Sequence, residues 1–267
     1  MVYAVNDQNE ADFIGLACEN PAYGAGMLAN YATYHRDDRY LSQWIVCDAK
    51  GYAHLAVQLY QQAITVCCTE EDTDSEAFAD FFSVMQEYQS IIAPIAFITS
   101  LPERVKSGKR IQSGSMMALQ NRQFLPPLVL ANGAKLMTKP SLDQLFVLLC
   151  ECSDDYRKRA NYNFWYTDLS YRIRHGTAQA VAVKQGGIYV SAACAFYLTG
   201  SAVIRDVCTL QDRRRLGYAK AAVAQLSHAL LQAGLTPHLL SVSPQADRLY
   251  ESVGFQTGSQ WAGLYNK

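Results

Sequence analysis

The sequence predicts an α/β (α+β) fold of two related domains in tandem, because one order of elements occurs twice along the chain. The order is a hairpin, a third strand, a charged segment and an amphipathic helix. The expected strands are residues 44–51, 52–60 and 63–69 in the first half and residues 177–183, 188–197 and 202–209 in the second half. Half of the 267 residues are hydrophobic, which is enough to fill two cores. We expect domains at residues 1–135 and 136–267, joined within the Gly-, Ser- and Pro-rich region 106–140.

An amphipathic helix is expected after the third strand of each half. In the first half, the apolar residues at helical spacing are Phe78, Phe81, Phe82 and Met85. In the second half, a helix over residues 217–233 has a stripe made of Ala219, Ala222, Val223, Leu226 and Leu230. After the helix of the first half, residues 90–94 are expected to begin another strand. A helix over residues 141–153, with Ser141 as its N-cap, is expected to open the second domain.

The overall charge excludes one class of function. The chain has 23 Lys and Arg against 24 Asp and Glu, a net charge of −1, with a sequence pI of about 6.5. No global basic field is therefore present to hold nucleic acid or an anionic membrane, and any anion site must be local. The first residues show no charged-then-apolar signal pattern, and the later apolar runs are too short to span a bilayer. We expect a cytoplasmic protein with neither nucleic acid nor membrane as a partner.

Eight cysteines are scattered without any C-x-x-C pair. This pattern is typical of buried thiols in a reducing compartment rather than of a disulfide framework or a zinc site. Cys150 and Cys152 have no His or Cys partner at ligand spacing, so we expect no metal.

A local anion site is predicted in the basic loop, which we define as residues 210–219, Leu-Gln-Asp-Arg-Arg-Arg-Leu-Gly-Tyr-Ala. The loop enters a helix directly, and the start of a helix offers free backbone N–H groups and a partial positive charge that suit a diphosphate. Gly217 and the small Ala219 let such a group come close, and Arg213, Arg214 and Arg215 add positive charge. The alternative is an ordinary solvated loop.

A second motif follows at Ser243-Pro244, which is expected to start a helix after a strand at residues 239–243. The apolar stripe of this helix is Ala246, Leu249, Tyr250 and Val253, and the segment ends at Gly254-Phe255.

Together the two motifs resemble the GNAT superfamily of acetyl-CoA-dependent N-acetyltransferases over residues 141–267. The family's pyrophosphate loop, Arg/Gln-x-x-Gly-x-Gly/Ala, is matched by Arg214, Gly217 and Ala219. Its Asn-x-x-Ala-x-x-Leu-Tyr-x-x-x-Gly-Phe motif is matched with Ser243 in the place of Asn. Gln211 also stands where proline is usual.

The resemblance implies domains with mixed, mostly antiparallel sheets flanked by helices, and acetyl-CoA as co-substrate. It also implies direct transfer of an acetyl group to a primary amine of a small molecule or peptide. The thioester carbonyl would be polarised by the N–H of Val207 or Thr209, and Tyr250 would protonate the leaving thiolate, although a core role fits Tyr250 as well. The implied coenzyme-binding residues are Val207, Cys208, Thr209, Arg214, Arg215, Leu216, Gly217, Tyr218, Ala219, Ser243 and Tyr250.

The general base stays open at the level of the sequence. Asp206 is taken as a catalytic candidate together with Tyr250, and the alternatives are Tyr189, Asp168, His175 or a relay through water. His175 has the side chain whose ordinary pKa lies nearest neutrality.

The first half has an acidic segment, residues 70–75, at the position of the basic loop. Its charge would repel a diphosphate, so we expect a degenerate GNAT-like domain without a coenzyme site. This domain would cover the acceptor site or mediate contacts.

Two other functions compete with the acetyltransferase. One is a non-catalytic acyl-CoA-binding or interaction module, and the other is an aminoacyl-tRNA-dependent transferase, which fits poorly with a complete coenzyme loop. The oligomeric state stays open, with a homodimer among the options.

Overall fold

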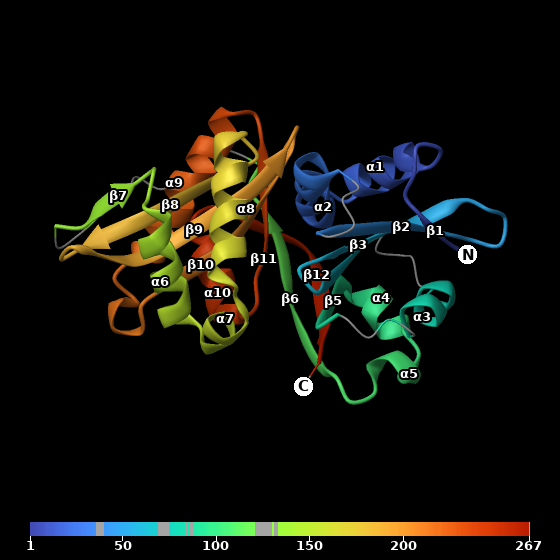
Figure 1. Ribbon diagram of the computed structural model, residues 1–267. Coiled ribbons are helices and arrows are strands. Elements are labelled where there is room, and N and C mark those ends of the chain that lie inside the picture. Colours follow the sequence, from blue (N-terminus) through green and yellow to red (C-terminus); the bar gives the residue numbers. More distant parts are fainter. Residues whose placement is uncertain are drawn as a thin grey trace. The chain divides into compact units, whose positions relative to one another are not determined.

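The computed structural model describes residues 1–35, 40–68, 75–83, 85, 88–120, 130 and 133–266 (Figure 1). Contacts divide the chain into two compact units. Unit 1 comprises residues 1–116, 240–243 and 257–267, and unit 2 comprises residues 117–239 and 244–256. Each unit has a sheet with flanking helices, as the sequence predicts.

The sheet of unit 1 has the order β1-β2-β3-β4-β5-β12-β6. Its strands are β1 (Val2–Ala4), β2 (Leu41–Cys47), β3 (Ala53–Tyr60), β4 (Ala63–Cys67), β5 (Ser90–Pro94), β12 (Gln256–Tyr265) and β6 (Arg110–Ala118). Its helices are α1 (Glu10–Glu19), α2 (Pro21–Tyr34), α3 (Glu76–Ser83), α4 (Ile95–Ser100) and α5 (Glu103–Lys106). The pairings from β1 to β4 are antiparallel, β4 and β5 are parallel, and β5 and β12 are antiparallel.

The sheet of unit 2 has the order β11-β10-β9-β8-β7. Its strands are β7 (Lys135–Met137), β8 (Ala178–Gln185), β9 (Ile188–Leu198), β10 (Ser201–Thr209) and β11 (Thr236–Leu240). Its helices are α6 (Leu142–Cys152), α7 (Asp154–Arg159), α8 (Tyr162–Arg174), α9 (Tyr218–Gln232) and α10 (Pro244–Glu251), with a 3₁₀ turn at Gln211–Arg213. Three antiparallel pairings lead to one parallel crossover, β10-α9-β11, which repeats β4-α3-β5 of unit 1. The predicted internal repeat is therefore confirmed.

The cores follow from the apolar stripes. In unit 2, Ala222, Val223 and Leu226 of α9 pack on the sheet through Val181 and Ile204. In unit 1, the predicted phenylalanine stripe of α3 lies in one core, and Phe13 and Met27 of α1 and α2 lie in a second. The sequence stripes gave no sign of α1 and α2, whose apolar residues are mainly small.

The extents of the two units differ from the predicted domains 1–135 and 136–267. The last strand, β12, belongs to unit 1, where Ala262 and Leu264 are buried in the core. Conversely, Met117 and Leu119 pack in the core of unit 2. The physical reason is that β5 needs a hydrogen-bonding partner on its second edge, and β12 supplies it.

Region 106–140, expected to be a connection, contains the nine-residue strand β6. Gly114 explains the misleading composition, because a Cβ at this position would lie 1.9 Å from the Ser241 carbonyl oxygen. The glycine here permits close packing of two backbones rather than a turn.

Two further expectations need correction at element ends. Strand β11 covers Thr236–Leu240 instead of residues 239–243. Ser141 does precede α6, but its hydroxyl makes no capping bond, and its backbone N–H donates to the Tyr189 hydroxyl at 2.9 Å.

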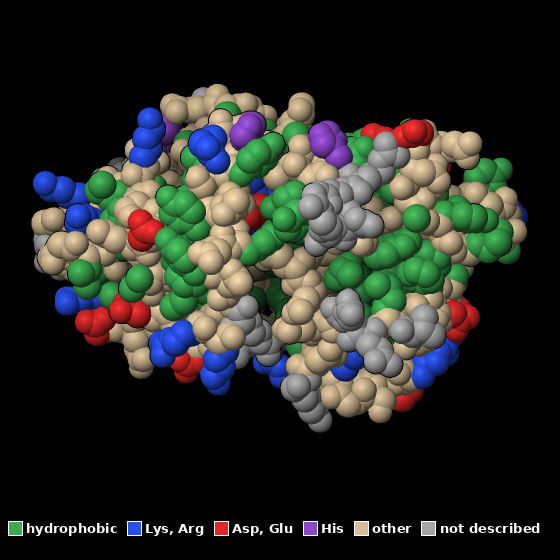
Figure 2. All heavy atoms as spheres, in the orientation of Figure 1, with side chains coloured by type: hydrophobic (Ala, Val, Ile, Leu, Met, Phe, Trp, Pro, Cys, Tyr) green, Lys and Arg blue, Asp and Glu red, His purple; other side chains and the backbone are tan. Residues whose placement is uncertain are grey.

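The surface agrees with the balanced composition. Figure 2 shows basic and acidic side chains interspersed on the face drawn. Within the described part of the chain, every helix is too short or too polar to cross a membrane.

Candidate functional site

The site is built where β10 loses one of its two neighbours. The parallel pairing of β10 with β11 runs from Ser201 opposite Thr236 to Ile204 opposite Leu239. Beyond Ile204, β10 continues to Thr209 and pairs with β9. From residue 205 to residue 209, the edge of β10 on the side of β11 therefore pairs with no strand among the described residues.

A β-bulge bends β10 at the same place. Arg205 lies opposite Cys194 and Cys208 lies opposite Ala192, so the strand has one residue more than its partner over this interval. Asp206 takes up the extra residue with φ of 54°. Aspartate is among the few non-glycine residues that adopt this left-handed conformation with any frequency.

The backbone N–H groups of Val207 and Thr209 point to the open edge. Leu210 donates its N–H to the Val190 carbonyl on β9 at 3.0 Å. Because N–H directions alternate along an extended strand, the N–H groups of Thr209 and Val207 point away from β9. The Ser191 hydroxyl fixes this end of the strand, since it lies 2.8 Å from both the Cys208 carbonyl oxygen and the Thr209 hydroxyl oxygen.

The basic loop connects this edge to the start of α9. Arg214 donates from Nε to the Thr209 carbonyl at 3.3 Å, which folds the loop back on the strand. Arg215 and Gly217 both have positive φ, of 64° and 80°. The first backbone bond of α9 joins the Ala221 N–H to the Gly217 carbonyl at 3.0 Å, so the N–H groups of residues 218–220 precede the helical bonding pattern. Apart from Gly217 and its two chain neighbours, no atom of the described chain lies within 4 Å of an ideal Cβ on Gly217, which leaves the approach open.

The side chains of the predicted loop residues separate into two kinds. Arg214, Arg215 and Leu216 are exposed, and Leu216 keeps 43% of its surface. Tyr218 is the first residue of α9, and its side chain is buried in the core of unit 2. Tyr218 can therefore offer a ligand only its backbone N–H, as can Ala219.

Tyr250 lies near the end of α10 and is largely buried, with its ring centroid 6.0 Å from that of Phe255. Burial and, to a lesser extent, the negative Asp247 raise its pKa to about 12. The phenol is thus protonated at neutral pH and can donate a hydrogen bond. Ser243 stands immediately before Pro244, the first residue of α10.

The structure places the candidate bases on different elements of unit 2. Asp206 is at the bulge of β10, with 16% of its side chain exposed. Tyr189 accepts the hydrogen bond from Ser141 that lies at the start of α6. His175 is exposed beyond the last residue of α8, with Nδ1 2.8 Å from the Tyr171 carbonyl oxygen.

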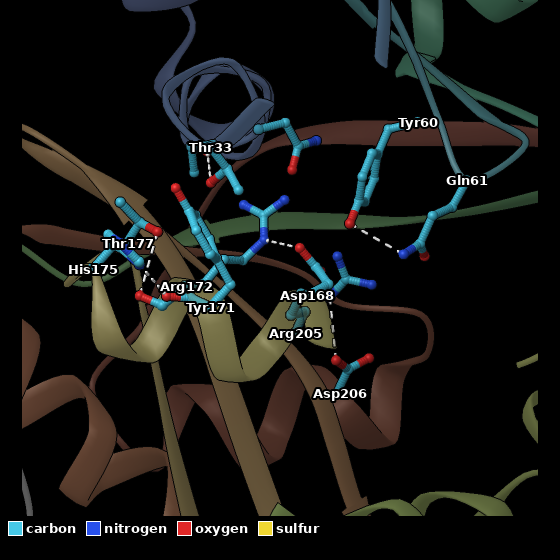
Figure 3. A network of polar contacts seen from close by, with 12 residues as sticks. Thr33, Tyr60, Gln61, Asp168, Tyr171, Arg172, His175, Thr177, Arg205 and Asp206 are labelled. Atoms are coloured by element: carbon cyan, nitrogen blue, oxygen red, sulfur yellow. Dashed lines mark hydrogen bonds and ion pairs between the residues drawn. The ribbon is translucent and has the colours of Figure 1, made fainter. Parts of the chain in front are cut away.

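Asp168, the remaining candidate, accepts from Arg172 Nε at 2.6 Å inside α8, where both side chains are buried (Figure 3). The guanidinium carbons of Arg172 and Arg205 lie 4.4 and 4.7 Å from the centroid of the Phe196 ring. Arg205 Nε is in turn 3.2 Å from Asp206 Oδ2. Asp168 thus belongs to a series of side-chain contacts that connects α8 to the bulge. Asp206 is the residue of this series that lies at the open edge of β10.

His238 is a candidate that sequence reasoning missed. It lies on β11 opposite Val203, one pair before the β10–β11 pairing ends, and 8% of its surface is exposed. Within the described residues its Nε2 is buried without a hydrogen-bond partner. Burial lowers its pKa to about 4, so the imidazole is neutral at pH 7 and resists protonation. The predicted strand began one residue too late to include it.

Comparison with known families agrees with this geometry. Residues 148–264 match the model of the GNAT acetyltransferase family. The C-terminal half of the chain is thus similar to this family over the matched residues. The open edge of β10, the bulge and the helix start at Gly217 all lie within the matched residues.

Solved structures extend the likeness in fold to the whole chain. A Drosophila protein has a TM-score of 0.69 at 12% identity, with 100% of this chain and 98% of that one covered. A GCN5-related N-acetyltransferase from Sphaerobacter thermophilus has a TM-score of 0.65 at 15% identity, with 99% and 94% covered. A tandem GNAT protein from the clavulanic acid biosynthesis pathway has a TM-score of 0.62 at 14% identity, with 99% and 97% covered. A search of curated protein sequences finds no significant match. The whole chain thus shares its fold with these structures, one of which is a tandem GNAT protein.

The buried His238 predicts a pH dependence of stability. In the unfolded chain this imidazole takes up a proton as the pH falls below its ordinary pKa of 6.5. In the folded chain it stays neutral until the pH reaches about 4, its pKa there. The free energy of unfolding of the wild type should therefore fall over this interval, by on the order of 3 kcal/mol relative to His238→Phe. Urea denaturation across the interval measures the difference. His228→Phe, on the exposed side of α9, should follow the wild type, and a His238→Phe curve parallel to the wild type would contradict the prediction.

Proposed function

We propose that the chain is an acetyl-CoA-dependent N-acetyltransferase that transfers the acetyl group directly to a primary amine of a small molecule or peptide. One observation carries the proposal. The open edge of β10, with the N–H groups of Val207 and Thr209, leads through the basic loop to the free N-terminus of α9. This arrangement suits a long ligand whose diphosphate lies at the start of α9 and whose carbonyl lies at the open edge of β10.

The diphosphate would be held by the start of α9. The N–H groups of residues 218–220 and the positive end of the helix dipole favour an anion. The first turn of α9 has no acidic residue, and Arg214 and Arg215 are exposed beside it. Gly217 adopts the left-handed conformation that starts the helix without a side chain in the way.

The reaction follows from the groups along β10. A hydrogen bond from the Val207 or Thr209 N–H would stabilise the negative charge that develops on the thioester oxygen. The neutral amine attacks the carbonyl carbon, and the tetrahedral intermediate then expels the CoA thiolate. Tyr250, protonated because of its raised pKa, would give the thiolate its proton.

The proton released by the amine needs an acceptor near the bulge. Asp206 is the candidate on the open edge, and the Arg205 contact at 3.2 Å orients its carboxylate. His238 has a free Nε2 within the described chain but is the weaker acceptor, because burial holds its pKa near 4. Transfer through water to either group is compatible with both positions.

Unit 1 is proposed to bind no coenzyme. Its acidic segment lies outside the described residues from Glu70 to Asp74, and Ser75 is buried. Glu76 opens the following helix α3, so the helix start already holds a negative charge, which disfavours a second anion. Arg104, a basic residue nearby, forms ion pairs with Glu76 and Asp80 at 2.6 and 2.7 Å.

Thiol release from acetyl-CoA in the presence of a panel of amines tests the proposed function. Turnover on at least one amine is expected, and Tyr250→Phe should lower kcat roughly 100-fold or more because the thiolate loses its proton donor. Tyr197→Phe is the matched control, since among the described residues the hydroxyl of this tyrosine donates only to the Ala178 carbonyl on β8, at 3.3 Å. Coenzyme binding without turnover on any amine would instead support a non-catalytic acyl-CoA-binding module.

Gly217 gives a test of the coenzyme site alone. Gly217→Ala and Gly200→Ala each add a methyl group at a residue with positive φ, 80° and 83°, where nothing nearby blocks it. Each substitution should therefore lower the free energy of unfolding by a similar amount, roughly 1–2 kcal/mol. Calorimetric titration should show CoA affinity reduced about tenfold or more in Gly217→Ala, equivalent to a loss of about 1.4 kcal/mol. Equal CoA affinity in the two variants would refute the assigned site.

A further inference from the structure

A fully buried hydroxyl group on β9 holds the end of β10. Ser191 has no exposed surface, and its side chain lies on the same face of the sheet as Ala193, which packs in the core of unit 2. A hydroxyl buried among apolar side chains costs free energy unless it is hydrogen-bonded. Ser191 makes two such contacts, with the Cys208 carbonyl oxygen and the Thr209 hydroxyl oxygen, each at 2.8 Å.

The bulge of β10 brings the two hydroxyls together. Thr209 lies directly opposite Ser191 because β10 has one extra residue at the bulge, and without that residue Cys208 would stand there instead. The next residue, Leu210, donates to the Val190 carbonyl at 3.0 Å. Thr209 and Ser191 therefore form a pair that exchanges no backbone hydrogen bonds, and in such pairs the opposite side chains lie closest.

The direction of the two hydrogen bonds follows from the protons available. Each hydroxyl has one proton to donate, and a carbonyl has none. Ser191 gives its proton to the Cys208 carbonyl, so the Thr209 hydroxyl must donate to Ser191 Oγ. Through its one hydroxyl, Ser191 thus holds both the Thr209 side chain and the carbonyl that precedes it.

The Cys208 carbonyl and the Thr209 N–H belong to the same peptide group. A trans peptide group is planar, and its C=O and N–H point in opposite directions. The hydrogen bond from Ser191 holds the carbonyl on the side of β9, so the N–H of Thr209 is directed to the open edge. Among the described residues no second strand pairs with β10 here, so this peptide group depends on contacts from β9 to keep its orientation.

We propose that Ser191 is a positioning residue for the acetyl transfer, which acts by directing the Thr209 N–H toward the thioester carbonyl oxygen. This inference rests on the proposed function. Ser191 is fully buried, so it contacts neither the coenzyme nor the amine and works through the peptide group alone. The N–H of Val207 belongs to a different peptide group, which the Ser191 hydrogen bonds do not include. Thr209 is therefore the better oriented of the two candidate donors.

The expected effect is on the transition state. A donor that is oriented in advance needs no reorganisation as negative charge develops on the thioester oxygen. Without the Ser191 hydroxyl, the peptide group between Cys208 and Thr209 can turn, and the Thr209 N–H is then poorly placed for that oxygen. Free CoA has no acyl carbonyl, so its binding does not depend on this N–H.

Amide hydrogen exchange, measured by NMR on the full-length chain without coenzyme, tests the local effect. The N–H of Leu210 reports on the end of β10, because it bonds the Val190 carbonyl. In Ser191→Ala this N–H should exchange about tenfold faster than in the wild type, since the strand end loses hydrogen bonds. The N–H of Thr236, 3.0 Å from the Gly200 carbonyl before the other end of β10, should exchange at the wild-type rate.

Ser227→Ala is the matched control. Ser227 is also fully buried in unit 2, on α9, and within the described chain its hydroxyl has no hydrogen-bond partner. The control substitution should not speed the exchange of Leu210. Wild-type exchange of Leu210 in Ser191→Ala would overturn the positioning role. Equal acceleration of Leu210 and Thr236 would also overturn it, because it would show a loss of overall stability instead of a local effect.

The acetyl-transfer rate is the second measurement. Ser191→Ala should lower kcat roughly tenfold or more, while the Kd of CoA from calorimetric titration should change less than about threefold. Ser227→Ala should keep both values. An unchanged kcat in Ser191→Ala, or a loss of CoA affinity as large as the loss of kcat, would overturn the role. If the wild type acetylates no amine, the proposed function fails, and the hydrogen exchange still decides whether Ser191 holds the peptide group.

Discussion

The functional half of this protein depends on the point at which β10 stops pairing with β11. A strand inside a sheet has both edges occupied by hydrogen bonds, and its backbone can offer nothing to a ligand. After Ile204, β10 is held by β9, and the bulge at Asp206 turns it further. The N–H groups of Val207 and Thr209 become available for that reason, and the basic loop begins where the open edge ends.

Local sequence patterns predicted the elements that build this site. The stripe of α9 and the alternating strands β8, β9 and β10 have short periods that nearby residues alone determine. Gly217 before a helical stripe indicated a helix start, and the structure gives it a left-handed conformation there. The role of the loop in binding a coenzyme came from the resemblance to a family and stays a prediction, as do the roles of Tyr250 and Asp206.

Partners distant in sequence decide what the patterns missed. β12 belongs to unit 1 because β5 offers an edge, and nothing in residues 256–265 indicates that partner. The glycine in β6 made the composition of this region look like that of a linker. In the structure, Gly114 instead lets the strand pack closely against the Ser241 backbone. The burial of His238 arises in the same way, because only the folded chain brings the residues that cover it together.

A crystal structure with acetyl-CoA bound is the most direct test of the central claim. The account predicts diphosphate oxygens within hydrogen-bond distance of the N–H groups of residues 218–220. It also predicts the thioester carbonyl oxygen on the N–H of Val207 or Thr209. Coenzyme bound beside α3 of unit 1, or bound with the open edge of β10 unoccupied, would contradict it.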